Sequence, residues 1–261
     1  MTSLGFLYPG RTAADDYVRA EQLLGGGVRL HAVRADATAT GATGADGSPL
    51  DGPDLTVDAV PVPSEERLAA VVEELRLSGA ETVVWAGPGF ALGAAGAHEQ
   101  VRALARAAGL PASSTSFGFA HAVRELGARR VAVATVYGAD LTERFTRFLA
   151  EEAGTEIVSV AGDPDAARPA TDPGGGPEGL AALRALVRAA DRPDAAAVLV
   201  PGTALRTAAH LTDLEADLGK PVLTANQVTV WEALRLADRR VNAPGLGALF
   251  TREPLVQVPT D

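Results

Sequence analysis

The chain has 261 residues, of which 47% are hydrophobic and 21% are charged, so it can bury a full core in one large domain or in two lobes. Its formal net charge of -10, without any basic patch, argues against nucleic acid or an anionic membrane as a partner. Cysteine is absent, which excludes disulfides, thiolate zinc sites and a cysteine nucleophile among these residues.

The first half of the chain alternates short apolar runs with helical patterns, which is typical of an α/β fold with a parallel sheet. The strands expected here are residues 4–8, 28–33, 82–86 and 111–114. The helices expected between them are residues 13–24, 65–78, 97–108 and 116–126. Thr12 and Ser64 are candidate N-caps for the first two helices. Residues 36–63 are rich in Thr, Gly, Asp and Pro without a helical period, which predicts a long loop.

The second half repeats the same rhythm. Its expected strands are residues 130–134, 156–160, 195–200 and 221–224, and its expected helices are residues 141–153, 178–190, 210–218 and 228–236. Residues 163–176 are of low complexity and predict a second long loop, and the tail after Pro244 has no regular pattern.

An internal repeat relates the two halves. LPASSTSFGFAHAVREL begins at Leu110 and KPVLTANQVTVWEALRL begins at Lys220, and each combines a strand, a polar knot and an apolar-faced helix. Such βαβ units call for parallel sheets with right-handed crossovers. The repeat therefore predicts two similar lobes related by a pseudo-twofold axis. The expected first lobe is residues 1–115 plus 227–261, and the expected second lobe is residues 116–226.

The stretch TVVWAGPGFALG, from Thr82 to Gly93, indicates where a ligand site lies. A strand that ends in glycines before a helix gathers backbone N–H groups at the carboxyl end of a parallel sheet, where open α/β folds bind ligands. The second half contains a comparable stretch, AVLVPGTA, from Ala197 to Ala204. We expect these two loops to face each other across one site in the cleft between the lobes.

Polar residues follow the strands of both halves, and they supply neutral donors that suit a carboxylate without a metal. The alternative is that such residues merely cap helices and make turns, as they do in any α/β protein. The candidate substrate-binding residues are Pro9, Arg11, Gly87, Pro88, Gly89, Ser113, Ser114, Thr115, Pro201, Gly202, Thr203 and Asn226.

Tyr137 and Asp15 are the candidate catalytic residues. Tyr137 ends a strand before a glycine, so it can donate its phenol O–H to a substrate oxyanion or simply pack at the strand end. Asp15 and its neighbour Asp16 are most simply first-turn helix acids, and a general base is the alternative role for them. Arg11 is either a cationic partner for a carboxylate or a solvated surface arginine. The histidines lack metal-like spacing and no nucleotide-binding motif is present, so neither metal nor cofactor is expected.

A series of short motifs runs in order along nearly the whole chain: LGFLYPG at Leu4–Gly10 with Asp15-Asp16-Tyr17, VVWA at Val83–Ala86, PASSTS at Pro111–Ser116, RRVAVAT at Arg129–Thr135 with Tyr137, and KPVLTANQ at Lys220–Gln227. Together they resemble the maleate cis-trans isomerases and arylmalonate decarboxylases of the aspartate/glutamate racemase superfamily. The resemblance implies two flavodoxin-like lobes with the site between them, no cofactor, and chemistry at a carbon next to a carboxylate.

The sequence departs from this family at the positions of the family's catalytic cysteines. The resemblance implies one cysteine per lobe in racemases and isomerases, and one in the second lobe in decarboxylases. The first would fall near Gly87 and the second at Pro201, and neither residue can move a proton. The binding apparatus carries over by position as Gly87–Gly89, Ser113–Thr115, Tyr137, Gly202-Thr203 and Asn226.

Three functions follow from this comparison and stay open at this point. The first is a cofactor-independent isomerase or decarboxylase that acts on a small carboxylate or dicarboxylate through an enediolate-like anion, without cysteine catalysis. The second is an inactive homologue that binds a small carboxylate, and the third is an enzyme with a different substrate in a specialised pathway. Without a signal peptide pattern or an apolar run of membrane-spanning length, we expect a cytoplasmic protein. Dimers are common for such folds, so a homodimer belongs to the expectations.

Overall fold

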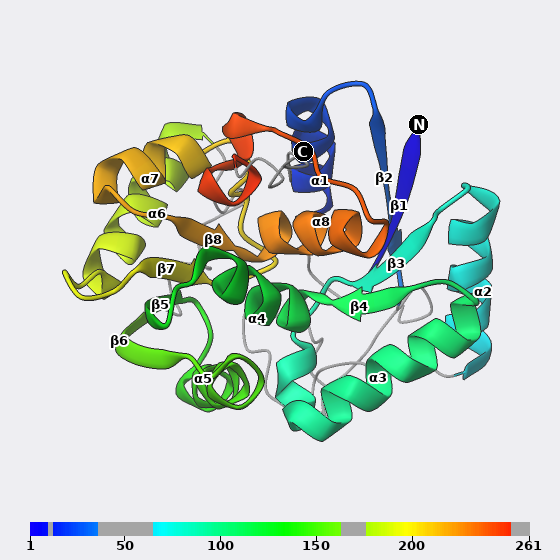
Figure 1. Cartoon of the computed structure of the whole chain (residues 1–261), viewed down its shortest axis with the longest axis horizontal. Coiled ribbons are helices and arrows are strands. Elements are labelled where there is room, and N and C mark those ends of the chain that lie inside the picture. The colour runs from blue at the N-terminus through cyan, green and yellow to red at the C-terminus, as the bar shows by residue number, and fades with distance from the viewer. Residues whose placement is uncertain (10–12, 36–64, 163–175, 252–261) are drawn as a thin grey trace, which may run out of the picture.

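The computed structural model describes residues 1–9, 13–35, 65–162 and 176–251, and it contains two parallel sheets (Figure 1). The first sheet has the strand order β2-β1-β3-β4 and the second has the order β6-β5-β7-β8. The strands are β1 (Thr2–Tyr8), β2 (Val28–Arg34), β3 (Thr82–Trp85), β4 (Ala112–Ser114), β5 (Arg130–Thr135), β6 (Glu156–Gly162), β7 (Ala197–Val200) and β8 (Val222–Thr224). The identical strand orders bear out the expected α/β fold of two similar parallel sheets.

Helices flank both sheets, as the alternating pattern predicts. They are α1 (Ala14–Leu24), α2 (Glu65–Leu77), α3 (Gly93–Ala108), α4 (Thr115–Leu126), α5 (Ala139–Ala153), α6 (Gly176–Ala190), α7 (Leu211–Leu218) and α8 (Ala225–Leu236), with short 3-10 turns η2 (Gly89–Leu92), η4 (Pro244–Leu246) and η5 (Ala248–Phe250). None of these described helices is long and apolar enough to cross a membrane.

Two helices cross between the halves and join them. Helix α8 follows the second sheet but packs on the first, where the Thr82 hydroxyl donates to the Ala233 carbonyl at 3.4 Å. Helix α4 follows the first sheet and packs against α5, with the rings of Phe119 and Phe145 centred 5.2 Å apart. The two helices lie side by side (Figure 1). The boundaries predicted for the two lobes stay a prediction.

A glycine allows the close approach of α4 and α8. A Cβ atom on Gly118 would lie 2.9 Å from the Val228 carbonyl oxygen, so any larger residue would push the helices apart. The middle of each central strand that these helices cover is buried, with Phe6 and Val133 each 0% exposed. Because both faces are covered, these strands are continuously apolar.

The ends of several elements differ from the expected ones by a few residues. Helices α4 and α8 begin at Thr115 and Ala225, because Ser114 and Thr224 act as their N-caps. The predicted tail after Pro244 instead contains two 3-10 turns. Some expectations lie outside the described residues, namely Arg11, the caps Thr12 and Ser64, the loop 36–63 and most of the loop 163–176.

Candidate functional site

The turn after β3 and the turn after β7 are connected through Tyr137, which contacts both of them. The ring of Phe90, in the turn after β3, lies 5.9 Å from the ring of Tyr137, which follows β5. The Ala13 N–H, which precedes α1, donates to the Thr203 carbonyl oxygen at 3.1 Å in the turn after β7. Residues far apart in the chain are thereby brought to one place.

In the turn after β3, hereafter the first turn, most backbone N–H groups are already paired within the protein. The Gly89 N–H donates to the Gly87 carbonyl at 2.8 Å, and the Phe90 N–H donates to the Ser116 hydroxyl at 2.9 Å. These amides therefore do not point at a ligand, as a glycine loop at a sheet edge would lead one to expect. Any anion held at this turn would have to be met by side-chain donors instead.

Gly87 lies against two neighbouring side chains. A Cβ atom at this position would stand 2.9 Å from Pro9 Cγ and 3.0 Å from Trp85 Nε1. Real Cβ atoms are not found that close to a rigid ring, so a side chain here would displace Pro9. The contact with Pro9, which follows β1, therefore leaves room only for glycine at position 87.

The four hydroxyl residues Ser113–Ser116, the polar knot of the repeat, direct their side chains to two different places. The Ser113 hydroxyl donates to the buried Glu232 at 2.7 Å, and the Thr115 hydroxyl shares a 2.6 Å hydrogen bond with Thr229. Both of these partners belong to α8. Ser113 and Thr115, although predicted to bind substrate, therefore connect the first sheet to a crossing helix.

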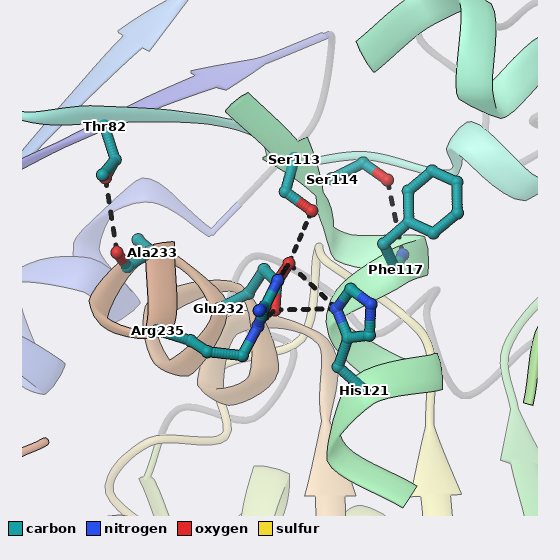
Figure 2. Close-up of polar contacts among 8 residues, drawn as sticks. All are labelled: Thr82, Ser113, Ser114, Phe117, His121, Glu232, Ala233 and Arg235. Atoms are coloured by element: carbon teal, nitrogen blue, oxygen red, sulfur yellow. Dashed lines mark hydrogen bonds and ion pairs between the residues drawn. The ribbon is translucent and has the colours of Figure 1, made fainter. Parts of the chain in front are cut away.

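The other two hydroxyls of the knot face the first turn. A Cβ atom on Gly89 would lie 3.3 Å from Ser116 Oγ and 3.6 Å from Ser114 Oγ. The Ser114 oxygen also accepts the Phe117 N–H at 3.4 Å as the cap of α4 (Figure 2). Ser116 is a site residue that the sequence prediction left out of its binding set.

Glu232 is a fully buried carboxylate, and Figure 2 shows it surrounded by Ser113, His121 and Arg235. It accepts hydrogen bonds from Ser113 at 2.7 Å, from His121 at 3.0 Å and from Arg235 at 2.7 and 2.8 Å. Burial alone would raise the pKa of Glu232, but the hydrogen bonds from Arg235, His121 and Ser113 outweigh burial and lower it. Glu232 thus stays ionised and ties α4, α8 and β4 together.

Tyr137 reaches the turn after β7. Its hydroxyl donates to the Pro201 carbonyl at 3.0 Å, and it accepts hydrogen bonds from the Thr203 backbone and side chain. Burial raises the pKa of the Tyr137 phenol to about 12, although the Thr203 hydrogen bonds act in the opposite direction. Tyr137 is therefore a protonated donor at neutral pH. The Pro201, Gly202 and Thr203 positions are all buried.

The acidic pair at the start of α1 divides into an exposed and a buried residue. Asp15 is 59% exposed and forms an ion pair with Arg206 at the surface, which is poor support for a general base. Asp16 is only 3% exposed, and burial raises its pKa. Of the two aspartates considered as general-base candidates, Asp16 is therefore the buried one.

Asp16 joins α1 to the second half of the chain. Its carboxylate accepts the N–H groups of Thr207 at 3.1 Å and Ala208 at 3.0 Å, and the Asn226 amide at 2.9 Å. The Asn226 amide also donates to the Leu205 carbonyl at 3.1 Å. The side-chain NH2 of Asn226, which was predicted to bind substrate, is thus already paired with Asp16 and Leu205. Its side-chain carbonyl oxygen has no partner among the described residues.

Comparison with known proteins decides the family. A family model described as arylmalonate decarboxylase matches residues 62–250. The chain belongs to the arylmalonate decarboxylase family. It is 34% identical over 154 residues to arylmalonate decarboxylase of Bordetella bronchiseptica, a match that spans 57% of this chain and 61% of that protein.

Solved structures agree with this assignment. A crystal structure of arylmalonate decarboxylase has a TM-score of 0.69 and 26% identity, over 96% of this chain and 100% of that chain. A maleate cis-trans isomerase of Nocardia farcinica, solved with a covalently bound succinylcysteine intermediate, has a TM-score of 0.72 and 19% identity, over 97% and 99% of the two chains. At that identity the second likeness shows the fold alone.

In this member of the arylmalonate decarboxylase family, the junction of the two halves combines neutral polar groups with the buried carboxylates of Asp16 and Glu232. The part of the chain that the structure describes contains no group of three or more histidine, aspartate or glutamate side chains placed to hold a metal ion. The expectation of a site without metal or cofactor stays a prediction, as do the roles of the individual site residues.

The sequence prediction missed Trp85, Gln100, Asp16 as a buried carboxylate, and Ser116. Trp85 ends β3 directly before the turn, so its place in the chain was a usable signal. Gln100 lies within α3, two residues after His98, and nothing in the helical pattern distinguishes it from a solvent-facing glutamine.

Proposed function

We propose that this protein decarboxylates, or isomerises, a small carboxylate or dicarboxylate through an enediolate-like anion, without cysteine catalysis. Family membership supports the substrate class. Decarboxylation is the reaction that best tolerates the absence of a thiol, because the carbanion forms by loss of CO2 and no base has to remove a proton. A malonate-class acid is therefore the preferred substrate.

The observation that carries this proposal is the hydrogen bond of 3.0 Å from the Tyr137 hydroxyl to the Pro201 carbonyl. Pro201 stands where the family resemblance places a thiol in the second half of the chain. Tyr137 thus supplies an O–H group next to that position. Because burial raises the pKa of this phenol to about 12, it carries its proton at neutral pH.

The proposed reaction uses this proton after the carboxyl group leaves. The electrons of the breaking C–C bond stay on the α-carbon and spread into the remaining carboxylate, while CO2 departs. Neutral donors stabilise the anion with little reorganisation. The Tyr137 O–H then protonates the α-carbon, and water returns a proton to the phenolate.

An inactive homologue that binds a small carboxylate is the second candidate. It is favoured by the first turn, whose Gly89 and Phe90 amides are paired within the protein. It also agrees with the absence of cysteine from the sequence.

Proton NMR in D2O tests the proposal on phenylmalonate, malonate and maleate. We expect CO2 loss with one deuteron incorporated at the α-carbon of a malonate, and a fall in turnover of roughly 100-fold or more for Tyr137→Phe. The melting temperature of each protein serves as the control for folding. Wild-type turnover by a folded Tyr137→Phe variant would refute the role of this residue, and binding without turnover by the wild type would favour the inactive homologue.

A further inference from the structure

Two buried polar side chains flank the Gly87–Gly89 turn without any hydrogen-bond partner among the described residues. Trp85 is 2% exposed and its indole Nε1 is unpaired. The side-chain amide of Gln100 is unpaired at both its nitrogen and its oxygen, and both of these atoms are buried. One group comes from the end of β3 and the other from α3.

Unpaired buried donors and acceptors are uncommon in native proteins because they forgo hydrogen bonds with water and gain none in return. A core would normally replace them with apolar residues of similar shape. Two such groups beside one glycine turn therefore indicate a partner from outside the chain. Their place, at the junction that holds Tyr137, agrees with a ligand.

Both groups point toward the backbone of the turn. The Cβ position of Gly87 is 3.0 Å from Trp85 Nε1, and the Cβ position of Gly89 is 2.9 Å from Gln100 Oε1. The hydroxyls of Ser114 and Ser116 converge on Gly89 as well, at 3.6 and 3.3 Å. Any side chain on Gly89 would therefore fill the place where Gln100 and the two serine hydroxyls meet, and Trp85 lies beside the same turn at Gly87.

The chemistry of the set matches a carboxyl group. The two serine oxygens accept backbone N–H groups, so each hydroxyl keeps its own hydrogen to donate. The indole N–H and the amide NH2 add further donors, and a carboxylate has about four lone-pair sites to receive them. All four side chains are neutral, as in a site that stabilises an oxyanion by fixed dipoles.

We propose that Trp85 and Gln100, with Ser114 and Ser116, form a carboxylate subsite for a small organic acid. This inference rests on the proposed function for its ligand class, and it adds the residues that determine specificity. The Gln100 oxygen accepts a hydrogen bond from a hydroxyl or a protonated carboxyl group of the same ligand. The subsite therefore prefers an acid that carries such a second group over a simple monocarboxylate.

Substitutions that remove only the polar atoms test the subsite. Trp85→Phe removes the indole N–H, and Gln100→Leu removes the amide at similar volume. Trp231→Phe is the matched control for the aromatic change, on α8 away from the turn. Gln227→Leu is the structural control, because Gln227 accepts the Thr224 N–H at 3.0 Å and donates to the Leu246 carbonyl at 2.7 Å.

Calorimetry with phenylmalonate and with maleate measures binding, and thermal melting without ligand measures stability. We expect each subsite variant to bind roughly 5- to 10-fold more weakly, as the loss of one neutral hydrogen bond predicts. We expect their ligand-free melting temperatures to stay level or rise, because an unpaired buried group is gone. Gln227→Leu should melt lower by about 3 °C or more, and Trp231→Phe should bind as the wild type does.

The outcomes separate this inference from the proposed function. Binding losses in Trp85→Phe and Gln100→Leu support the subsite even if the wild type turns over none of the acids, a result that would refute the proposed activity alone. Unchanged affinity together with melting temperatures that fall as in Gln227→Leu would overturn the subsite, because internal water would then be the partner of these groups. Failure of the wild type to bind either acid would overturn it as well.

Discussion

Replacing Glu232 with glutamine should destabilise the protein by unlinking its two halves. Glu232 is 0% exposed and receives hydrogen bonds from Ser113, His121 and Arg235, which come from β4, α4 and α8. Glutamine has nearly the same volume, so Glu232→Gln tests charge and hydrogen bonding without opening a cavity. Its amide NH2 must also face at least one donor, which cannot pair with it.

The structure sets the expected size of this effect. Hydrogen bonds to a charged group contribute about 1.5–3 kcal/mol each, and breaking a buried ion pair costs about 3–5 kcal/mol. Arg235 is 43% exposed and His121 is 30% exposed, so both recover water contacts when the charge disappears. We therefore expect a loss of about 2–3 kcal/mol in the free energy of unfolding, or roughly 4–10 °C in melting temperature.

Urea unfolding at several pH values is the assay, since the effect depends on ionisation. The pKa of Glu232 in the folded protein lies below its ordinary value of 4.5, so the folded state favours the carboxylate. Its contribution to stability is then fully present above pH 4.5 and is lost as the pH falls through the lower, folded-state pKa. The stability gap between wild type and Glu232→Gln should be full at pH 7 and shrink below pH 4.5.

Comparison of the two proteins at each pH cancels the titration of other carboxyl groups, including Asp16. Glu73→Gln serves as the control, because Glu73 is 53% exposed and its ion pair with Arg76 lies at the surface. That control should change stability by less than about 0.5 kcal/mol. Equal stability of wild type and Glu232→Gln at pH 7, or a gap that is constant down to acid pH, would refute the argument.

Two further substitutions test the site by urea unfolding. Gly87→Ala should cost about 1–3 kcal/mol, because its Cβ atom would lie 2.9 Å from Pro9 Cγ, whereas a Cβ atom on the exposed Gly26 meets nothing within 4 Å, so Gly26→Ala should be neutral or slightly stabilising. Equal effects of the two alanines would contradict the contact at Gly87. Asp16→Asn should cost about 1–3 kcal/mol, because its new NH2 group faces donors from the second half of the chain. The exposed Asp15→Asn is its control, and a similar loss in both would contradict the anchoring role of Asp16.

The sequence by itself determined the architecture. Strand and helix periods are local properties, so alternating patterns and the repeat beginning at Leu110 and Lys220 were enough to predict two similar parallel sheets. The same patterns indicated that the turns after β3 and β7 belong together. They did so because each turn follows the carboxyl end of a parallel strand, where ligands bind, and because the repeat gives the two turns equivalent places in the two lobes.

Only the tertiary structure decided where each polar side chain points. Ser113 turns away from the turn because its partner Glu232 lies on α8, 119 residues along the chain. Asp16 rather than Asp15 is buried because its partner Thr207 arrives from 191 residues away. Gln100 became a candidate only because its side-chain oxygen lies 2.9 Å from the Cβ position of Gly89. Such contacts depend on how each helix is rotated and shifted against its neighbours, and no local pattern in the sequence fixes that placement.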